Sequence, residues 1–306
     1  MRILVTGRAI PTQPDRCTGQ QLAEGFRQAG HECVFYGCFY GEPNNFLGVK
    51  EVQGTDFDLV VVTEMNDGMW GYESLFNYYK LKDVPRLYWD FDVSYHPDVS
   101  LARAGKIAYD GYLVGNRFFV DDFAKKFGKP SLMLPYACSP QIHRKMPGVK
   151  KESLIGFIGS LTAEREALFE KVPVKHVNGV FGDDLITETN KLYCMLHKNQ
   201  DACKGLVPGR PWETAGCGTT LFMDRDSYLD FAPFLDLKDD KLADVFVYDN
   251  EDEIIEFIVD WNVAKKRAEL EEMGDRLMTH MHANHTYKNR AEAIIEWSKE
   301  QKILKS

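Results

Sequence analysis

The sequence lacks the features that mark membrane-spanning and secreted proteins. No apolar run approaches the ~18 residues that a bilayer-spanning helix needs, and the chain opens on a strand-like pattern instead of a signal peptide. Its 7 cysteines form no Cys-x-x-Cys pair, and several lie in or beside apolar runs, as buried thiols do in a reducing compartment. These absences predict a cytoplasmic protein without a disulfide framework.

Positive charge is also scarce. The chain has 37 Lys and Arg residues against 46 Asp and Glu residues, which gives a net charge of −9. Nonspecific binding to a nucleic-acid duplex relies on Lys and Arg at phosphates, so such a chain is a poor platform for it. Lys and Arg are concentrated in two groups, within residues 103–129 and 144–151. Either group could form a local phosphate-binding patch, although lysine-rich surface that only contacts solvent is commoner.

At 306 residues the chain fits two domains of about 150 residues each. Continuous apolar runs such as residues 59–62 indicate strands that are covered on both faces, as in parallel sheets. The strands expected in the first domain are residues 2–6, 32–36, 59–63, 86–90, 111–114 and 131–134. Those expected in the second domain are residues 154–158, 174–178, 193–196, 219–223 and 245–248. Residues 139–151 form the expected crossing between the domains.

Parallel strands place their carboxyl ends at one edge of a sheet, and polar residues follow several of the predicted strands. Asp90 and Asp92 alternate with Phe91 at the end of one strand, and His96 follows them. Two carboxylates at this place can bind an acceptor, serve as a general base or hold a metal, whereas an Asx-turn or a helix cap is the structural alternative. Asp92 is the stronger candidate for a base if the protein is an enzyme whose reaction inverts the configuration at the substrate carbon.

The most informative segment covers residues 209–224, in which Gly-Arg-Pro-Trp-Glu-Thr-Ala-Gly-Cys-Gly precedes an apolar strand pattern. It predicts a short helix with Pro211 in its first turn and glycines at its end. Free N–H groups and the helix dipole attract phosphate to a helix N-terminus, where Arg210 adds a guanidinium. Glu213 supplies an acceptor suited to a sugar diol. An ordinary helix–turn–strand corner explains the same pattern without a ligand.

This segment resembles the donor-site motif of nucleotide-sugar glycosyltransferases with the two-domain GT-B architecture. In that family an Arg, then a Glu, then a small-residue run ending in Cys-Gly forms the nucleotide pocket of the C-terminal domain. Other runs are similar to GT-B segments: residues 2–37 with Gly19, residues 154–160 followed by Arg165, residues 134–140, and His285-Thr-Tyr-Lys-Asn-Arg290. The last of these resembles the CgeB-like branch within group 1 of the family.

The resemblance implies an α/β fold of two Rossmann-like parallel-sheet domains, with a deep interdomain cleft and a C-terminal helix that crosses back. Residues 1–140 with the helix 287–306 would form the acceptor-side domain, and residues 150–286 the donor domain. It implies transfer of a sugar from a nucleotide diphosphate donor, foremost a UDP-sugar, to a hydroxyl of a small molecule, a glycan, a protein or a modified DNA base. The protein's own cations would leave little need for a metal ion.

The resemblance also implies roles for residues at the two sheet edges. The expected donor-binding residues are Gly7, Gly19, Gly159, Ser160, Arg165, Arg210 and Glu213, and the expected catalytic residues are Asp90, Asp92 and His96. The two arginines would neutralise the departing diphosphate, and Glu213 would hold the ribose hydroxyls. His96 would contact the donor sugar from the opposing domain.

Two departures from the family pattern keep alternatives open. Gly205 replaces the first member of the family's acidic pair, and only Gly19 remains of two adjacent glycines. A nucleotide-sugar-binding protein without catalysis therefore stands beside the enzyme, as does a viral type of enzyme that glycosylates hydroxymethylated DNA bases. His280, His282 and His285 predict no metal site, because no nearby third ligand has a distinctive spacing.

Overall fold

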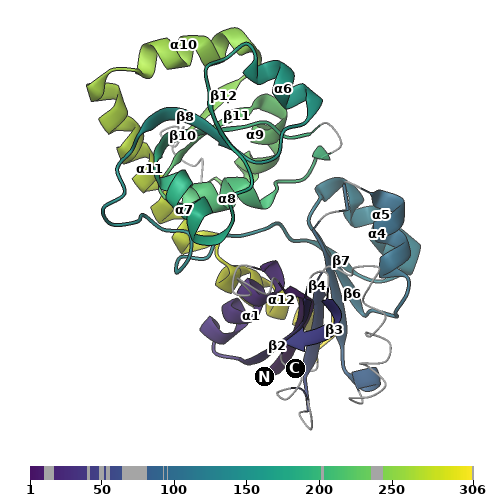
Figure 1. The fold of residues 1–306 in the computed structure, drawn as a ribbon. Coiled ribbons are helices and arrows are strands. Elements are labelled where there is room, and N and C mark those ends of the chain that lie inside the picture. Colours follow the sequence, from purple (N-terminus) through teal and green to yellow (C-terminus); the bar gives the residue numbers. More distant parts are fainter. Residues whose placement is uncertain are drawn as a thin grey trace. The chain divides into compact units, whose positions relative to one another are not determined.

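The computed structural model describes residues 1–9, 17–39, 42–47, 52, 56–63, 81–91, 93–94, 96–200, 203–235 and 244–304. The chain divides into two compact units, each built on one β-sheet (Figure 1). Unit 1 contains Met1–Tyr136 and Tyr287–Ser306, and unit 2 contains Ala137–Thr286. Within the described residues, no helix has both the length and the apolar character that crossing a bilayer requires.

The sheet of unit 1 has seven described strands in the order β3-β2-β1-β4-β5-β6-β7. Neighbouring strands are parallel except for β2 and β3. The strands are β1 (Arg2–Ala9), β2 (Glu32–Phe39), β3 (Glu42–Leu47), β4 (Leu59–Thr63), β5 (Arg86–Asp90), β6 (Gly111–Val114) and β7 (Ser131–Met133). The helices are α1 (Thr18–Gln28), α4 (Pro97–Ala104), α5 (Val120–Phe127) and α12 (Tyr287–Glu300), with short 3-10 turns η2 (Leu81–Asp83) and η3 (Arg117–Phe119).

Helices cover both faces of this sheet, which is why residues 59–62 of the central strand β4 are all apolar (Figure 1). On one face, Tyr88 and Tyr112 belong to a buried cluster that includes Phe123 of α5. On the other face, a Cβ added to Gly111 would lie 2.7 Å from the Trp297 ring of α12. All residues of β4 are buried. The parallel strands predicted from the apolar runs, and the Rossmann-like domain that the family resemblance implies, are confirmed for this unit.

The antiparallel edge strand β3 is not among the predicted strands. Its sequence, Glu-Pro-Asn-Asn-Phe-Leu, contains a proline and two asparagines, which are uncommon in strands. It pairs with β2 at Gly37 and Leu47, with a register shift between Cys38 and Phe39. The segment therefore forms a strand because it pairs with β2, and not because its residues favour the extended conformation.

The C-terminal helix α12 belongs to unit 1 although it follows unit 2 in the sequence. It packs on α1 at Gly25, where an added Cβ would lie 2.3 Å from the carbonyl oxygen of Tyr287. The buried guanidinium of Arg290 donates to the carbonyl oxygens of Pro135, at 3.1 Å, and Tyr136, at 3.0 Å. The returning helix is thereby tied both to α1 and to the chain that leaves β7.

Unit 2 has a sheet of five described strands, all parallel, in the order β12-β11-β10-β8-β9. The strands are β8 (Ser153–Ile158), β9 (Lys175–Val177), β10 (Leu192–His197), β11 (Thr220–Asp224) and β12 (Val245–Tyr248). The helices are α6 (Ala163–Phe169), α7 (Gly182–Asn190), α8 (Gly209–Gly216), α9 (Arg225–Phe231), α10 (Glu251–Trp261) and α11 (Ala264–Asn284), with the 3-10 turn η5 (Ala232–Phe234). Each strand predicted for this sheet has a counterpart, so the second Rossmann-like sheet is confirmed as well.

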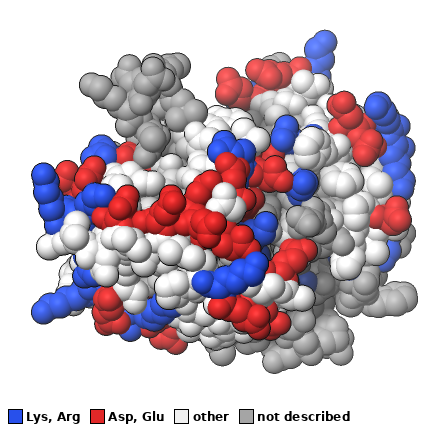
Figure 2. Space-filling model, turned by 90° about the horizontal axis from the view of Figure 1, so that it is seen from above, with Lys and Arg blue, Asp and Glu red and all other residues white. Residues whose placement is uncertain are grey.

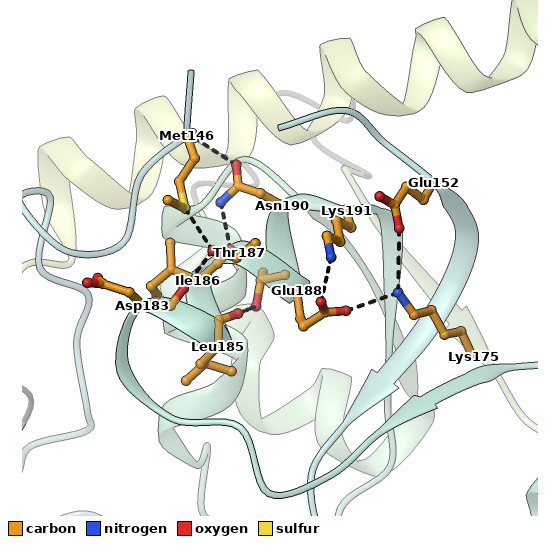
Figure 3. A network of polar contacts seen from close by, with 11 residues as sticks. Met146, Glu152, Lys175, Asp183, Leu185, Ile186, Thr187, Glu188, Asn190 and Lys191 are labelled. Carbon is orange, nitrogen blue, oxygen red and sulfur yellow. Dashed lines mark hydrogen bonds and ion pairs between the residues drawn. The ribbon is translucent and has the colours of Figure 1, made fainter. Parts of the chain in front are cut away.

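Helix α7 holds the segment at residues 144–146, near the start of unit 2, in place through hydrogen bonds (Figure 3). The buried Asn190 accepts from the Met146 amide at 3.0 Å and donates to the Arg144 carbonyl oxygen at 3.1 Å. On the same helix, Glu188 holds Lys175 at 3.0 Å and Lys191 at 2.7 Å. Residues 144–146, within the expected crossing, are therefore held by unit 2.

Candidate functional site

The carboxyl edge of the unit 2 sheet collects the ends of several chain segments. β8 leads into Gly159 and Ser160, β10 ends at His197, and β11 ends at Asp224. Because these strands are parallel, their ends share one edge. Helix α8 runs directly into the start of β11, so the opposite end of α8, its N-terminus, points back to that same edge. This is the edge at which open α/β sheets bind ligands.

Arg165 joins two of these segments. It lies in the first turn of α6, where the N-cap Thr162 accepts from its amide at 3.4 Å. Its guanidinium stacks over the Phe157 ring and donates to the carbonyl oxygens of Ser160, at 2.9 Å, and Lys198, at 2.7 Å. Arg165 therefore ties the loop after β8 to the loop after β10. This positioning role is new, and its predicted contact with a phosphate stays a prediction.

The loop at Gly159 is held from the side of β9. The Nε2 atom of His176 lies 2.9 Å from the carbonyl oxygen of Gly159. Gly159 has φ of +156°, a conformation that glycine adopts far more readily than other residues. Ser160 beside it is exposed. The backbone alone thus requires a glycine here, and the donor contacts of Gly159 and Ser160 stay predictions.

The N-terminal half of α8 carries both residues of the predicted donor motif, with Arg210 in the first turn and Glu213 one turn further along the helix. Arg210 and Glu213 form an ion pair with 2.8 Å between Nη1 and Oε2, and each side chain is 27% exposed. The N-cap residue Pro208 makes no side-chain hydrogen bond to the helix, so its side chain satisfies none of the first amides. The turn therefore presents a cation, a carboxylate and backbone N–H groups at one accessible place.

The rest of α8 is packed tightly. The buried Trp212 ring meets Phe231 and Phe234 edge-on, with centroids 4.9 and 5.2 Å away. At the other end of the helix, Gly218 has φ of +71°. Helix α11 approaches so closely there that a Cβ added to Gly274 would lie 2.3 Å from the Gly218 carbonyl oxygen. These contacts, around Trp212 and at the C-terminal end, fix the position of α8 and therefore of Arg210 and Glu213.

His197 is a polar residue of this edge that the sequence analysis missed. It is the last residue of β10 and 5% exposed, and its buried Nε2 atom has no hydrogen-bond partner in the part of the chain that the structure describes. Burial lowers the pKa of His197 to about 4, with Asp224 acting against this shift and Arg165 and Arg210 adding to it. The ring is therefore neutral at neutral pH. Its only signal in the sequence is a place one residue beyond a predicted strand.

Asp224 organises the loop between β10 and α8. Its carboxylate accepts from the Ser227 hydroxyl at 2.6 Å and from the backbone amides of Ser227 and Asn199, both at 3.1 Å. Asn199 in turn donates to the carbonyl oxygens of Cys203 and Leu206, both at 3.1 Å. Asp224 is thus committed to holding this loop and to capping α9.

In unit 1, the predicted donor residues Gly7 and Gly19 meet at Thr63. A Cβ added to Gly7 or Gly19 would lie 2.3 or 2.6 Å from the Thr63 hydroxyl oxygen. That hydroxyl donates to the carbonyl oxygen of Thr6 at 2.8 Å. Close packing among β1, α1 and β4 is therefore sufficient reason for both glycines, and their contact with a donor stays a prediction.

The predicted catalytic residues of unit 1 differ in their surroundings. Asp90 is 5% exposed, and its carboxylate accepts from the Tyr88 hydroxyl at 3.3 Å. His96 is exposed and directly precedes α4. Asp92 lies outside the described residues. The catalytic roles of all three stay predictions.

The histidines of the last helices have structural partners. Nε2 of His280 lies 3.0 Å from the Phe234 carbonyl oxygen, and Nε2 of His282 lies 2.8 Å from that of His143. His285 packs against the Trp212 ring. In the part of the chain that the structure describes, no three His, Cys, Asp or Glu side chains are grouped to hold a metal ion.

Comparisons with known proteins agree with this architecture. A family model described as Glycosyl transferase-like matches residues 144–296, which is half of the chain. A comparison with curated proteins finds no match.

Several solved structures share the fold. The chain is similar to the DNA-modifying enzyme β-glucosyltransferase, with a TM-score of 0.61 and 12% identity over 98% of this chain and 99% of that one. A phage T4 β-glucosyltransferase with UDP and Mn²⁺ has a TM-score of 0.59 and 14% identity over 98% and 99% of the two chains. A glycosyltransferase from Rickettsia africae has a TM-score of 0.59 and 8% identity over 98% of both chains. At such identities the likeness shows the two-domain GT-B fold alone.

Proposed function

The chain belongs to the Glycosyl transferase-like family, and from this premise we propose that it transfers a sugar from a nucleoside diphosphate donor to an acceptor hydroxyl. The donor binds at the carboxyl edge of the unit 2 sheet. The observation that carries this proposal is the N-terminal half of α8, where Arg210 and Glu213 are half-buried close to helix amides that the N-cap side chain leaves uncapped.

The N-terminal half of α8 offers groups that can bind both the phosphates and the ribose of a nucleoside diphosphate. The helix N-terminus and the Arg210 guanidinium attract the phosphates. When Arg210 turns to the diphosphate, the Glu213 carboxylate loses its ion-pair partner and accepts from the ribose hydroxyls instead. We infer a uridine nucleotide first, because one structural neighbour contains UDP and another is described with uridine diphosphoglucose.

The chemical step gains most from stabilising the leaving diphosphate. Negative charge grows on that group as the glycosidic bond breaks, and a fixed guanidinium is worth more to the transition state than to the substrate. On the acceptor side, we infer that a residue among Asp90, Asp92 and His96 takes the hydroxyl proton. His96 is exposed, whereas Asp90 is buried and bonded to Tyr88, so His96 reaches a substrate more readily than Asp90 does.

The charges favour a small molecule, a glycan or a protein as acceptor over DNA. In the basic group 144–151, Lys151 donates to the Leu192 carbonyl oxygen at 2.5 Å and to the Thr219 hydroxyl at 3.1 Å, and Lys145 pairs with Asp275. These lysines are occupied within unit 2. Figure 2 shows a band of acidic side chains on one face of the molecule, and Asp252, Glu256 and Asp260 on α10 are exposed. Such a surface repels the DNA backbone.

Glu213→Ala tests the donor site without knowledge of the sugar or the acceptor. The variant removes the acceptor of two ribose hydroxyls and leaves Arg210 in place. Hydrogen bonds to a charged group contribute roughly 1.5–3 kcal/mol, so UDP affinity falls about tenfold to a hundredfold. Calorimetric titration with UDP measures this. The matched control is Glu256→Ala on the exposed side of α10, which leaves the affinity unchanged. Equal affinity of a folded Glu213→Ala protein and the wild type would overturn the donor site.

We also expect sugar transfer to proceed with a chelator present. Arg210 and the N-terminus of α8 supply fixed positive charge where the diphosphate departs. An excess of EDTA should therefore change the initial rate of transfer, or of slow donor hydrolysis, by less than about twofold. Collapse of the rate, with recovery on adding Mn²⁺, would contradict a protein-only cation site. Tight UDP-sugar binding with no turnover on any acceptor would favour the non-catalytic alternative.

A further inference from the structure

The buried His197 ring has no role in the account so far. Its backbone is fixed, because it is paired with β11 and its carbonyl oxygen accepts from the Tyr248 hydroxyl at 3.2 Å. Its Nε2 atom nevertheless has no hydrogen-bond partner among the described residues. A buried nitrogen without a partner carries an uncompensated desolvation cost. A ligand that bonds to it would remove that cost.

The charges around His197 indicate which ligand that is. Arg165 of α6 and Arg210 of α8 both act on its titration, as does Asp224 at the end of β11. Arg165 and Asp224 are bonded to neighbouring loops, as described above. Within the described part of the chain, Arg210 forms its ion pair with Glu213, and both side chains are 27% exposed. Two guanidinium groups and one imidazole at one sheet edge fit an anion with several acceptor oxygens, such as a diphosphate.

We propose that His197 is a donor-binding residue: its Nε2–H bonds to a phosphoryl oxygen of the bound nucleoside diphosphate, and the ring takes up a proton from solvent as the nucleotide binds. This inference rests on the proposed function of the same site. Because Nε2 is enclosed in the ligand-free chain, binding includes a movement in which Arg210 leaves Glu213 for the diphosphate.

The proposal makes donor binding depend on pH in a defined direction. The free chain holds His197 neutral, since burial lowers its pKa to about 4. A neighbouring anion favours the imidazolium and raises the pKa by about 1–3 units. Whenever the complex binds a proton more tightly than the free protein, affinity for the ligand rises as the pH falls through the pKa of the complex. Relative to a variant that lacks the imidazole, the wild type therefore gains UDP affinity as the pH falls from about 8 to about 5–6.

The experiment compares the whole chain with its His197→Gln variant, using UDP as the probe. Histidine ring resonances of the ¹⁵N-labelled wild type report the protonation of His197 with and without UDP, and the variant assigns them. Calorimetry measures UDP affinity across the same pH range. UDP's own phosphate also titrates in this range, and that contribution is common to both proteins, so their difference isolates His197. His31→Gln in unit 1 is the matched control.

We expect UDP to move the His197 titration upward by about one pH unit or more. We also expect His197→Gln to weaken binding about tenfold near pH 6 and less at higher pH, with His31→Gln without effect. If UDP binds both proteins equally and leaves the His197 resonances unchanged, this inference is wrong while the donor site stands. If the wild type does not bind UDP, the proposed uridine donor site and this inference both fail. If the His197→Gln protein does not fold, assignment through the backbone resonances identifies the His197 ring in the wild type, and its titration with and without UDP then decides.

Discussion

Arg210→Ala lowers kcat/KM for sugar transfer about a hundredfold to a thousandfold, which is the usual loss when one fixed donor to a developing negative charge is removed. The loss has two sources. The guanidinium no longer stabilises the departing diphosphate, and its positive charge no longer offsets the negative charge of Glu213, its partner at 2.8 Å in the free chain, beside the anionic donor. Steady-state rates with the best donor from a screen of UDP-sugars measure the effect.

Two variants make the Arg210 result specific. Arg210→Lys keeps the charge but loses the fork-shaped donor set, so it recovers part of the rate only. Arg225→Ala removes an arginine of the same unit that is exposed and paired with Asp249 at the start of α9, and it keeps wild-type rates. A folded Arg210→Ala enzyme with undiminished kcat/KM would place the diphosphate elsewhere.

Gly25→Ala destabilises the protein by about 2–3 kcal/mol, although alanine favours a helix over glycine. The added Cβ would lie 2.3 Å from the Tyr287 carbonyl oxygen and 2.5 Å from its carbon. These are backbone atoms at the start of α12, so the whole helix must move away from α1. Chemical denaturation followed by the tryptophan fluorescence measures the loss.

Gly105→Ala is the matched control for Gly25→Ala. Gly105 ends α4 with φ of −84°, which alanine adopts without strain. Its added Cβ meets atoms no closer than 3.4 Å. We expect unchanged or slightly higher stability, because alanine reduces the freedom of the unfolded chain. Equal stability of the Gly25→Ala and Gly105→Ala proteins would contradict the close packing of α12 on α1.

The parts of the fold that the sequence predicts are those set by local pattern. The run at residues 59–62 marks a strand buried on both faces, and the structure buries all of β4. The short helix that carries Arg210 and Glu213 follows from a proline, two glycines and an apolar strand in order. Such patterns act over a few residues, so they survive in a single sequence.

The remainder depends on contacts between distant segments. β3 exists because β2 offers it an edge. Gly7 and Gly19 are required because the Thr63 side chain, more than forty residues away in the sequence, leaves no room for a Cβ. The two carbonyl oxygens that hold Arg165 belong to separate loops. The unpartnered Nε2 of His197 exists only once neighbouring strands enclose it. No spacing in the sequence reveals any of these.

A crystal structure of the chain with UDP tests the central claim most directly. The account predicts the diphosphate at the N-terminus of α8, within hydrogen-bonding distance of the Arg210 guanidinium, and the ribose hydroxyls on the Glu213 carboxylate. Density for UDP away from the carboxyl edge of the unit 2 sheet, with Arg210 and Glu213 still paired to each other, would contradict it.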